Sequence, residues 1–298
     1  MSGASGPLGE AIADALRAKG YRITTLVRRD PKHADEIRWD PSAPQMDGAP
    51  LEGAAGIIHL SGENVAEGRW SDEKKRRIID SRVQSTSLLA KTIAGLSAKP
   101  GAFLSASAIG YYGSARGDDE LTESSSNGDD FLADVCARWE RASEGAGVRT
   151  VNLRFGLVLT RNGGALGKLL PLFKRGLGGR VGSGKQVMSW ISGKDAAAAV
   201  VHALETPTLS GPVNVVAPRP VTNQEFTEKL AKALGKGTAL PVPAFVLKVA
   251  YGQMGVETVL ASQRVVPQKL LDSGFEFTHD RLLAALRDEL EVTAPSSQ

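Results

Sequence analysis

The sequence has little of what holds disulfide-rich or metal-dependent folds together. It contains a single cysteine, Cys136, so neither an internal disulfide nor a cysteine-rich metal site can form. Its four histidines are scattered without the spacing of metal ligands, and we therefore predict no metal site. One unpaired cysteine also fits a reducing compartment, and we expect a cytoplasmic protein.

Long apolar runs and a large excess of one charge are also absent. No apolar run reaches the roughly 18 residues of a membrane span, and no signal-peptide pattern is found. Lysine and arginine number 36 against 33 acidic residues, so we expect neither nucleic acid nor a membrane among the partners. The densest basic cluster, DEKKRRIID (72–80), is either a solvated helix face or an anion contact. We expect a small-molecule substrate and a monomer or homodimer.

Short apolar runs that alternate with longer helical patterns dominate what is there. This alternation predicts an α/β fold, a parallel sheet with helices on both faces. Ser71 is the predicted N-cap of the longest helix, because Asp72 and Glu73 follow it in the first turn. We predict strands over 21–27, 56–62, 101–107, 149–160 and 211–217, and helices near 8–19, 71–96, 129–146 and 195–205.

The pattern changes after about residue 160. Residues 160–186 are rich in glycine and basic residues, and helices are predicted over 222–234, 243–254 and 279–290. We expect a dinucleotide-binding domain over 1–162, to which 192–218 return, and a smaller, mostly helical substrate lobe over 163–191 and 219–298. This lobe would cover the carboxyl edge of the sheet, where open α/β folds bind ligands. Only the terminal TAPSSQ is predicted to be disordered.

The chain begins with a glycine-rich stretch, MSGASGPLG, directly before the first predicted helix. Gly3, Gly6 and Gly9 have the spacing of a phosphate-binding loop, in which glycines let the backbone approach a pyrophosphate at a helix N-terminus. Arg28 and Arg29 end the next predicted strand, where dinucleotide folds face the adenosine ribose. Arginine at this place suits a 2′-phosphate, so we predict NADP (NADPH) as the cofactor. Surface arginines in a turn before a proline are the alternative.

Seven motifs then follow one another in a fixed order. They are SGASGPLG, HLSGENVAEGRW, SRVQST, SASAIGYYG, RFGLVLTRNGGAL, GSGKQVMSWI and FVLKVAYGQMGVETVLASQRVVPQKLLDSGFEF. Together they closely resemble an atypical branch of the extended short-chain dehydrogenase/reductases, labelled NAD-dependent epimerase/dehydratase-like, with a C-terminal helical segment of unknown function. The resemblance implies a Rossmann-type doubly wound fold, a bound nicotinamide dinucleotide and a C-terminal substrate lobe. We assign to the cofactor Gly3, Ser5, Gly6, Pro7, Leu8, Gly9, Arg28, Arg29, Leu60, Ser61, Gly62, Glu63, Arg82, Ser105, Phe155 and Gly156.

The resemblance also shows what the catalytic apparatus lacks. Related enzymes use a serine, a tyrosine and a lysine, with a glutamate four residues after the lysine. Glu140 fits that glutamate, which puts Cys136 at the lysine position and Leu132 at the tyrosine position. A shift by one residue gives Phe131 and Val135 instead, so the dyad is absent in either register.

The serine of this set remains as Ser107. Tyr111 and Tyr112 follow it, and either hydroxyl is a candidate acid. The alternatives are a packing role for Tyr112, a noncatalytic Tyr111, a Ser105 hydroxyl satisfied by the backbone and a Cys136 that belongs to the core.

Arg82 stands where the family carries an asparagine in the mid-sheet helix. It would reach a cofactor phosphate or an acidic substrate, and a surface salt bridge to Asp80 or Glu73 is the alternative. Asp195 reads as the N-cap of the helix near 195–205. The residues predicted to face the substrate are Asn64, Arg69, Trp70, Gln186, Ser189 and Trp190.

One element of the family pattern is missing, the apolar strand of about five or six residues before the glycine loop. Its loss would leave ladder groups of its neighbours unpaired. A start codon assigned too late, another segment that fills the gap, or a defective protein would each explain this, and we expect the first.

For function, we expect an NADP-dependent oxidoreductase or epimerase-like enzyme that acts on a small polar or carbonyl-bearing substrate. Reduction is favoured over epimerisation because the usual base is gone. The alternative is a noncatalytic NADP(H)-binding sensor.

Overall fold

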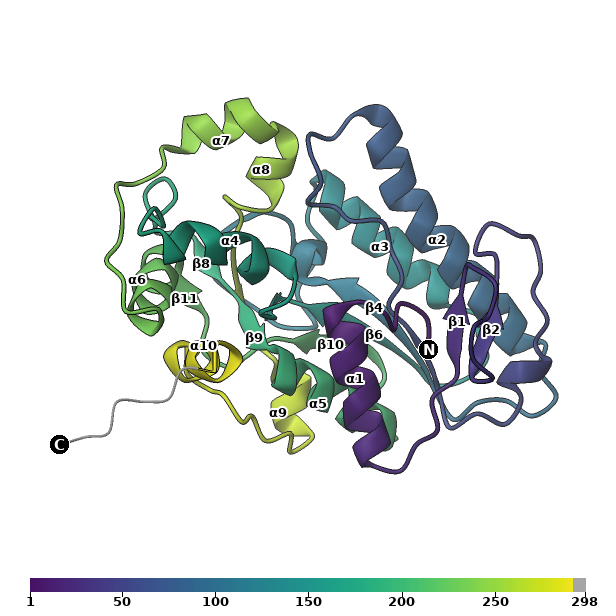
Figure 1. Cartoon of the computed structure of the whole chain (residues 1–298). Helices are drawn as coiled ribbons and strands as arrows, with labels where there is room; N and C mark the ends of the chain where they lie inside the picture. The colour runs from purple at the N-terminus through teal and green to yellow at the C-terminus, as the bar shows by residue number, and fades with distance from the viewer. Residues whose placement is uncertain (292–298) are drawn as a thin grey trace.

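A computed structural model describes residues 1–291, so the predicted disorder of TAPSSQ (293–298) lies outside the described residues. Its centre is a parallel sheet of β3 (Ile57–His59), β4 (Phe103–Ala108), β6 (Thr150–Phe155) and β10 (Gly211–Val215), in the order β10-β6-β4-β3 (Figure 1). A second parallel pair, β1 (Thr25–Val27) and β2 (Glu36–Arg38), lies beside β3. Among residues 1–291, no helix is long and apolar enough to span a bilayer.

Met1 and Ser2 lie between β1 and β3. Ser2 makes parallel bridges to both Leu26 and His59, and thereby joins the β1–β2 pair to the central sheet. The amide of Ser2 donates to the carbonyl of Ile58 at 3.0 Å, and the carbonyl of Met1 accepts from Leu26 at 2.7 Å. Some of the ladder groups expected to be unpaired therefore have partners.

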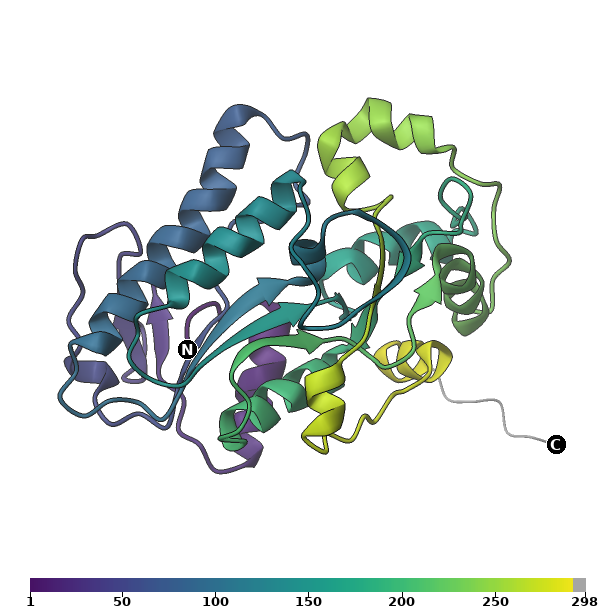
Figure 2. The same ribbon diagram turned by 180° about the vertical axis from the view of Figure 1, so that it is seen from behind.

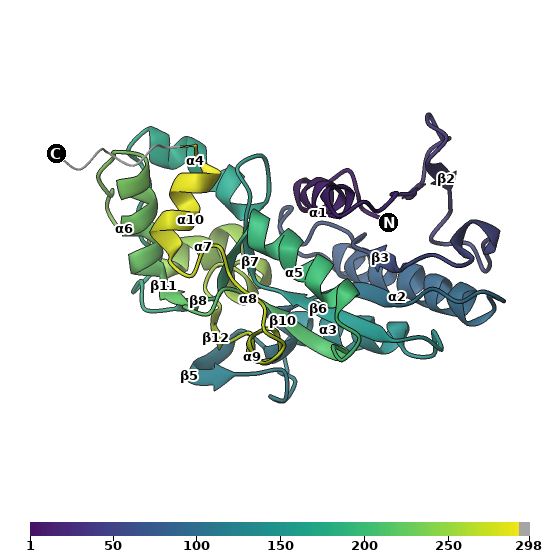
Figure 3. The ribbon, with the colours of Figure 1, turned by 90° about the horizontal axis from the view of Figure 1, so that it is seen from below.

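Helices cover both faces of the sheet, as predicted. Helices α1 (Pro7–Ala18) and α5 (Gly193–Glu205) pack together on one face, where Ile12 and Val200 share a core cluster with Leu104 and Val213 of the strands. Helices α2 (Asp72–Ala94) and α3 (Phe131–Ser143) lie on the other face, seen from behind in Figure 2. Figure 3 shows the two helical layers on either side of the strands. The Rossmann-type doubly wound fold is thus confirmed.

Helix N-caps show where local sequence determined the structure. Ser71 caps α2 and accepts the amide of Lys74 at 3.2 Å, as predicted. Asp195 is not the N-cap of α5, because Ser192 takes that position. Asp195 instead lies fully buried one turn later and accepts the amides of Thr278 and His279.

The rest of the chain forms short strand pairs and helices beside the sheet's carboxyl edge. The expected strand over 149–160 breaks at Gly156, and the expected helix over 243–254 breaks at Gly252, whose φ is +58°. The expected strand over 21–27 shrinks to β1, and 160–186 contain a helix that was not predicted. The elements are β7 (Leu157–Leu159) paired with β9 (Trp190–Ser192), β8 (Val187–Met188) with β11 (Val221–Thr222), β5 (Ala115–Leu121) with β12 (Ser262–Val265), and helices α4 (Gly164–Lys174), α6 (Asn223–Ala233), α7 (Ala244–Tyr251), α8 (Gln253–Glu257), α9 (Gln268–Asp272) and α10 (Leu282–Glu289).

Candidate functional site

The glycine loop forms a cradle at the start of α1. Gly3 has a φ of +71°, and a Cβ there would lie 3.0 Å from backbone atoms of Leu60 and Ser61, so this position requires glycine. A Cβ on Gly9 would overlap the carbonyl oxygen of Gly3. The N-cap, Gly6, offers no side chain to the helix amides, and Pro7 follows as the first helical residue. An uncapped N-terminus beside a close backbone turn is a favourable place for a phosphate group.

Arg82, on α2, lies against the segment after β3, and the same segment contacts Gly3 of the glycine loop. A Cβ on Gly62 would come within 3.1 Å of the Arg82 guanidinium carbon, which stacks over the Trp139 ring at 4.8 Å. One guanidinium N–H donates to the backbone carbonyl four residues earlier in α2, and burial lowers the pKa of Arg82. Neither Asp80 nor Glu73 forms an ion pair with Arg82, so the alternative prediction of a surface salt bridge is wrong. The Arg82 guanidinium therefore lies beside the loop that follows β3.

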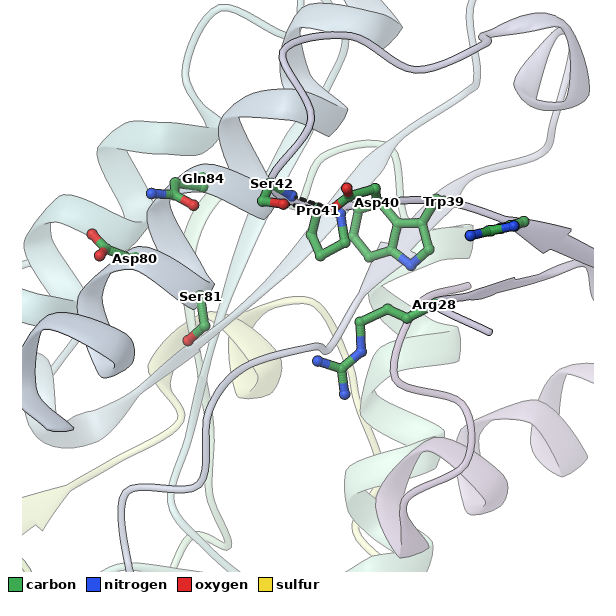
Figure 4. Close-up of a pocket in the computed structure, with 9 residues that line it drawn as sticks. Arg28, Trp39, Asp40, Pro41, Ser42, Asp80, Ser81 and Gln84 are labelled. Atoms are coloured by element: carbon green, nitrogen blue, oxygen red, sulfur yellow. Dashed lines mark hydrogen bonds between the residues drawn. The ribbon is translucent and has the colours of Figure 1, made fainter. Parts of the chain in front are cut away.

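A cavity of about 450 Å³ lies where dinucleotide folds hold the adenosine half of the cofactor. Figure 4 shows how its walls come from three elements: the residue after β1, the residues at and after the end of β2, and one face of α2. Most of these residues were missed, because the strand EIR (36–38) was not predicted. The cavity is lined by Arg28, Arg38, Trp39, Asp40, Pro41, Ser42, Asp80, Ser81 and Gln84.

The two arginines after β1 have different surroundings. Arg29 donates to both carboxylate oxygens of Glu36, at 2.6 and 2.8 Å, and so lowers the pKa of Glu36 to about 2. Arg28 lines the cavity, and no carboxylate pairs with it within residues 1–291. Arg38 also lines the cavity, although it pairs with Asp30 at 2.7 Å. Arg28 therefore lies at the cavity, whereas Arg29 is held by Glu36 within the β1–β2 pair.

Ser107 belongs to a buried ionic cluster at the carboxyl ends of β4 and β6. Its hydroxyl donates to Glu140 at 2.7 Å, and Arg154 binds both oxygens of the same carboxylate at 2.7 and 2.8 Å. Ser107 and Arg154 are direct neighbours across the two strands. Arg154 is almost fully buried, and the Glu140 carboxylate raises its pKa. The bidentate pair fixes the guanidinium in one orientation.

Both candidate tyrosines contact this guanidinium, and their rings pack edge-to-face with centroids 5.5 Å apart. The Tyr112 hydroxyl is buried, donates to Asn214 at 2.6 Å and accepts from Arg154 at 2.9 Å; burial raises its pKa to about 12. These contacts argue for the packing role of Tyr112. The Tyr111 ring lies over the Arg154 guanidinium at 3.5 Å and is partly exposed.

Two further predicted residues turn out to be internal. The Ser105 hydroxyl is fully buried, with a contact of 3.4 Å to the carbonyl of Ala106, so it does not reach the cofactor surface. Cys136 is buried in α3, and burial raises the pKa of its thiol to about 12. Both match the structural alternatives weighed from the sequence.

The residues predicted to face the substrate fall into two groups. The Asn64 side chain accepts a hydrogen bond from the amide of Ala66, and the Trp70 indole donates to the carbonyl of Val65. Both side chains therefore bond within their own loop. Arg69 is exposed beside the α7–α8 junction.

Of the three residues predicted from the later motif, Gln186 alone lines the second cavity described below. Ser189 and Trp190 are buried: the Ser189 hydroxyl donates to the carbonyl of Gln263 in β12, and the Trp190 indole donates to the carbonyl of Arg219. Their prediction as substrate contacts is corrected.

The other predicted cofactor residues surround the glycine loop or follow neighbouring strands. Ser5 and Pro7 are exposed on the loop, and Leu8 is partly exposed. Leu60 and Ser61 follow β3. The Glu63 carboxylate is bound by Lys74 at 2.7 Å, which lowers the pKa of Glu63.

Phe155 ends β6, and Gly156 follows it where a Cβ would come within 2.6 Å of the Ser189 carbonyl oxygen. Gly156 is therefore required for strand packing. Across residues 1–291, no cluster of three or more potential ligands is arranged to hold a metal ion.

A parallel sheet wound on both faces, a glycine loop before its first helix and an adenosine-sized cavity at its edge define a Rossmann-type dinucleotide-binding protein. Residues 1–217 match the model of the NAD dependent epimerase/dehydratase family, and the chain belongs to that family. Residues 242–289 match a domain of unknown function, DUF1731.

Relatives match over nearly the whole chain. The chain is 39% identical over 289 residues to the epimerase family protein Mb2239 of Mycobacterium bovis, covering 96% of this chain and 95% of that protein. It is 36% identical to the human epimerase family protein SDR39U1, over 97% of this chain and 98% of the relative.

Solved structures agree with these matches. The crystal structure of human SDR39U1 with NADPH superposes with a TM-score of 0.90 at 33% identity, over 98% of both chains. A nucleoside-diphosphate sugar epimerase from Corynebacterium glutamicum has a TM-score of 0.80 at 35% identity, over 97% of this chain and 57% of that one. UDP-glucose 4-epimerase of Thermus thermophilus, solved with NAD, is 19% identical with a TM-score of 0.75, which shows a shared fold.

Proposed function

We propose that this chain is an NADPH-dependent oxidoreductase or epimerase-like enzyme that acts on a small polar or carbonyl-bearing substrate. The observation that carries the proposal is the Tyr111 ring on the Arg154 guanidinium, beside Ser107 at the carboxyl edge of the sheet. Ligands of open α/β folds bind at that edge. The NADPH-bound human relative supports the choice of cofactor.

The chain offers a separate group to each part of the cofactor. The uncapped N-terminus of α1 and the Arg82 guanidinium flank the place of the diphosphate, and Arg28 would hold the 2′-phosphate. NADPH, when bound, supplies a hydride to the carbonyl carbon of the substrate. These residues fit the cofactor because their donors are not bound by carboxylates of the described chain.

Tyr111 acts as the general acid in this proposal. Its hydroxyl donates a proton to the carbonyl oxygen, and the resulting phenolate is stabilised by the guanidinium against its ring. Glu140 keeps that guanidinium in place through two hydrogen bonds. Reduction is favoured over epimerisation, because the residues at the usual tyrosine and lysine positions, Leu132 and Cys136, carry no base.

Paired tyrosine variants test this assignment. A panel of aldehydes and ketones is screened for NADPH oxidation, and binding of NADPH is measured by calorimetry. Tyr111→Phe should lower turnover about 100-fold or more and leave the NADPH affinity unchanged. Tyr112→Phe, the matched control, should lower stability and keep turnover within a few-fold once folded. Equal turnover in the wild type and Tyr111→Phe would reject Tyr111 as the acid.

A sensor that reads NADP(H) without turnover is the second candidate. The sensor is favoured by the burial of Cys136, which stands at the lysine position of the dyad and whose thiol has a raised pKa. Tight NADPH binding together with no turnover of any carbonyl compound by the wild type would decide for the sensor.

A further inference from the structure

A second cavity, of about 330 Å³, is lined mainly by residues from the C-terminal half of the chain. Its walls combine the start of β5, the loop over 182–186 and the two helices α7 and α8, which Figure 1 shows side by side next to the N-terminal end of α2. Ala244 and Lys248 are one helical turn apart and present one face of α7 to it. The cavity is lined by Ser114, Ala115, Gly182, Ser183, Gln186, Ala244, Lys248, Val256 and Leu260.

A short segment of chain connects this cavity to Tyr111, the proposed acid. Ser114 follows Tyr111 by three residues and stands two residues after the end of the 3₁₀ turn (Ile109–Tyr112). The Gln263 amide donates to the carbonyls of Ile109 and Gly113, at 2.9 and 2.7 Å, and so fixes both ends of the turn. The cavity wall at Ser114 is therefore three residues along the chain from Tyr111, on a segment that Gln263 holds in place.

The lining has one positive charge and no carboxylate. Lys248 is its only ionisable residue, and no ion pair involves Lys248 within residues 1–291. The Gln186 amide donates to the carbonyl of Val181, which leaves the amide oxygen available as an acceptor. Two serine hydroxyls add donors, and the remaining walls are aliphatic side chains or glycine. Such a lining suits a small anion with a short aliphatic chain.

We propose that this cavity binds the carboxylate end of a small oxo acid, with Lys248 as its counter-ion and the carbonyl group extended toward Tyr111. This inference rests on the proposed function and gives the helical segment 242–289 the task of selecting the substrate. A nucleotide sugar would bring two phosphate charges against one lysine, into a cavity at the lower end of the range for ligand sites.

The test measures binding of named probes to the protein saturated with NADP⁺. 4-Oxopentanoate, 5-oxohexanoate and 7-oxooctanoate are each compared with their methyl esters by calorimetry, and UDP-glucose is titrated in parallel. We expect at least one acid to bind fivefold or more tightly than its ester. Lys248→Gln should abolish that difference, and Lys248→Arg should keep most of it. Lys236→Gln, which removes an exposed lysine outside the cavity, should leave it unchanged.

The outcomes separate the two proposals. If NADPH binds but every ester binds as tightly as its acid, the inference is overturned and the cofactor assignment stands. Tighter binding of UDP-glucose than of every oxo acid, lost in Lys248→Gln, would also overturn it. If the wild type fails to bind NADPH, the proposed function itself fails. Unchanged NADPH affinity in Lys248→Gln shows that the variant is folded.

Discussion

The choice between NADPH and NADH should depend on one of the two adjacent arginines. Arg28 lines the adenosine cavity without an acidic partner, whereas Arg29 is held by Glu36 through two hydrogen bonds. A charge-assisted hydrogen bond contributes about 1.5–3 kcal/mol, and exposure of Arg28 to solvent favours the lower end. We therefore expect Arg28→Ala to weaken NADPH binding about 10-fold. Binding of NADH, which lacks the 2′-phosphate, should change by less than about twofold.

Arg29→Ala is the matched control, because it removes the same charge one residue away. Calorimetric titration of both variants with NADPH and NADH gives the ratio of the two affinities for each. Arg29→Ala should keep the wild-type ratio of affinities apart from a small decrease, because solvent screens the effect of the removed charge on the 2′-phosphate. The assignment would be refuted if Arg29→Ala reduced the ratio as much as Arg28→Ala, or if neither variant changed it.

Two further predictions concern stability. Glu140→Gln leaves Arg154 buried without its counter-ion and should lower the free energy of unfolding by about 3–5 kcal/mol. Asp134→Asn, which breaks the exposed pair with Arg138, should cost less than about 1 kcal/mol in the same denaturant titration; similar losses in both would contradict the role of burial. His59 is fully buried between Ser2 and Ser85, and burial lowers its pKa to about 3. Its contribution to stability is present above pH 6.5 and is lost as the pH falls toward 3, because the unfolded chain then binds a proton that the folded chain cannot. Between pH 7 and pH 5, the free energy of unfolding should fall by about 2 kcal/mol more in the wild type than in His59→Asn. His33→Gln, which replaces an exposed histidine, should behave as the wild type. Equal falls in the wild type and in His59→Asn would show that His59 is not the cause.

The sequence predicted the layers of the fold because they depend on local patterns. The apolar stripe of α1 and the cap at Ser71 are set within a few residues, and the structure has both. The pairing of β5 with β12 depends on contacts between segments far apart in the chain, and no local pattern indicated it. The break at Gly156 also follows from tertiary contact, since the carbonyl of Ser189 and the side chain of Val216 leave no room for a Cβ.

The sequence predicted that the candidate site lies at the strand ends. It did not predict which side chains point into the site. Arg28 and Arg29 look equivalent in the sequence, and only the register of β1 against β2 brings Glu36 beside Arg29. Tyr111 and Tyr112 differ by one step of a 3₁₀ turn, which points one hydroxyl inward to Asn214.

The turn that carries Tyr111 lies against the two positions at which the dyad is absent. A Cβ on Gly110 would lie 3.4 Å from the Leu132 side chain and 3.6 Å from the Cys136 sulfur, so the turn that carries Tyr111 packs directly on the positions where the dyad would stand. Because the turn is held from the other side by Gln263, it cannot retreat without breaking two hydrogen bonds. The turn that carries Tyr111 is thus fixed against α3 on one side and by Gln263 on the other.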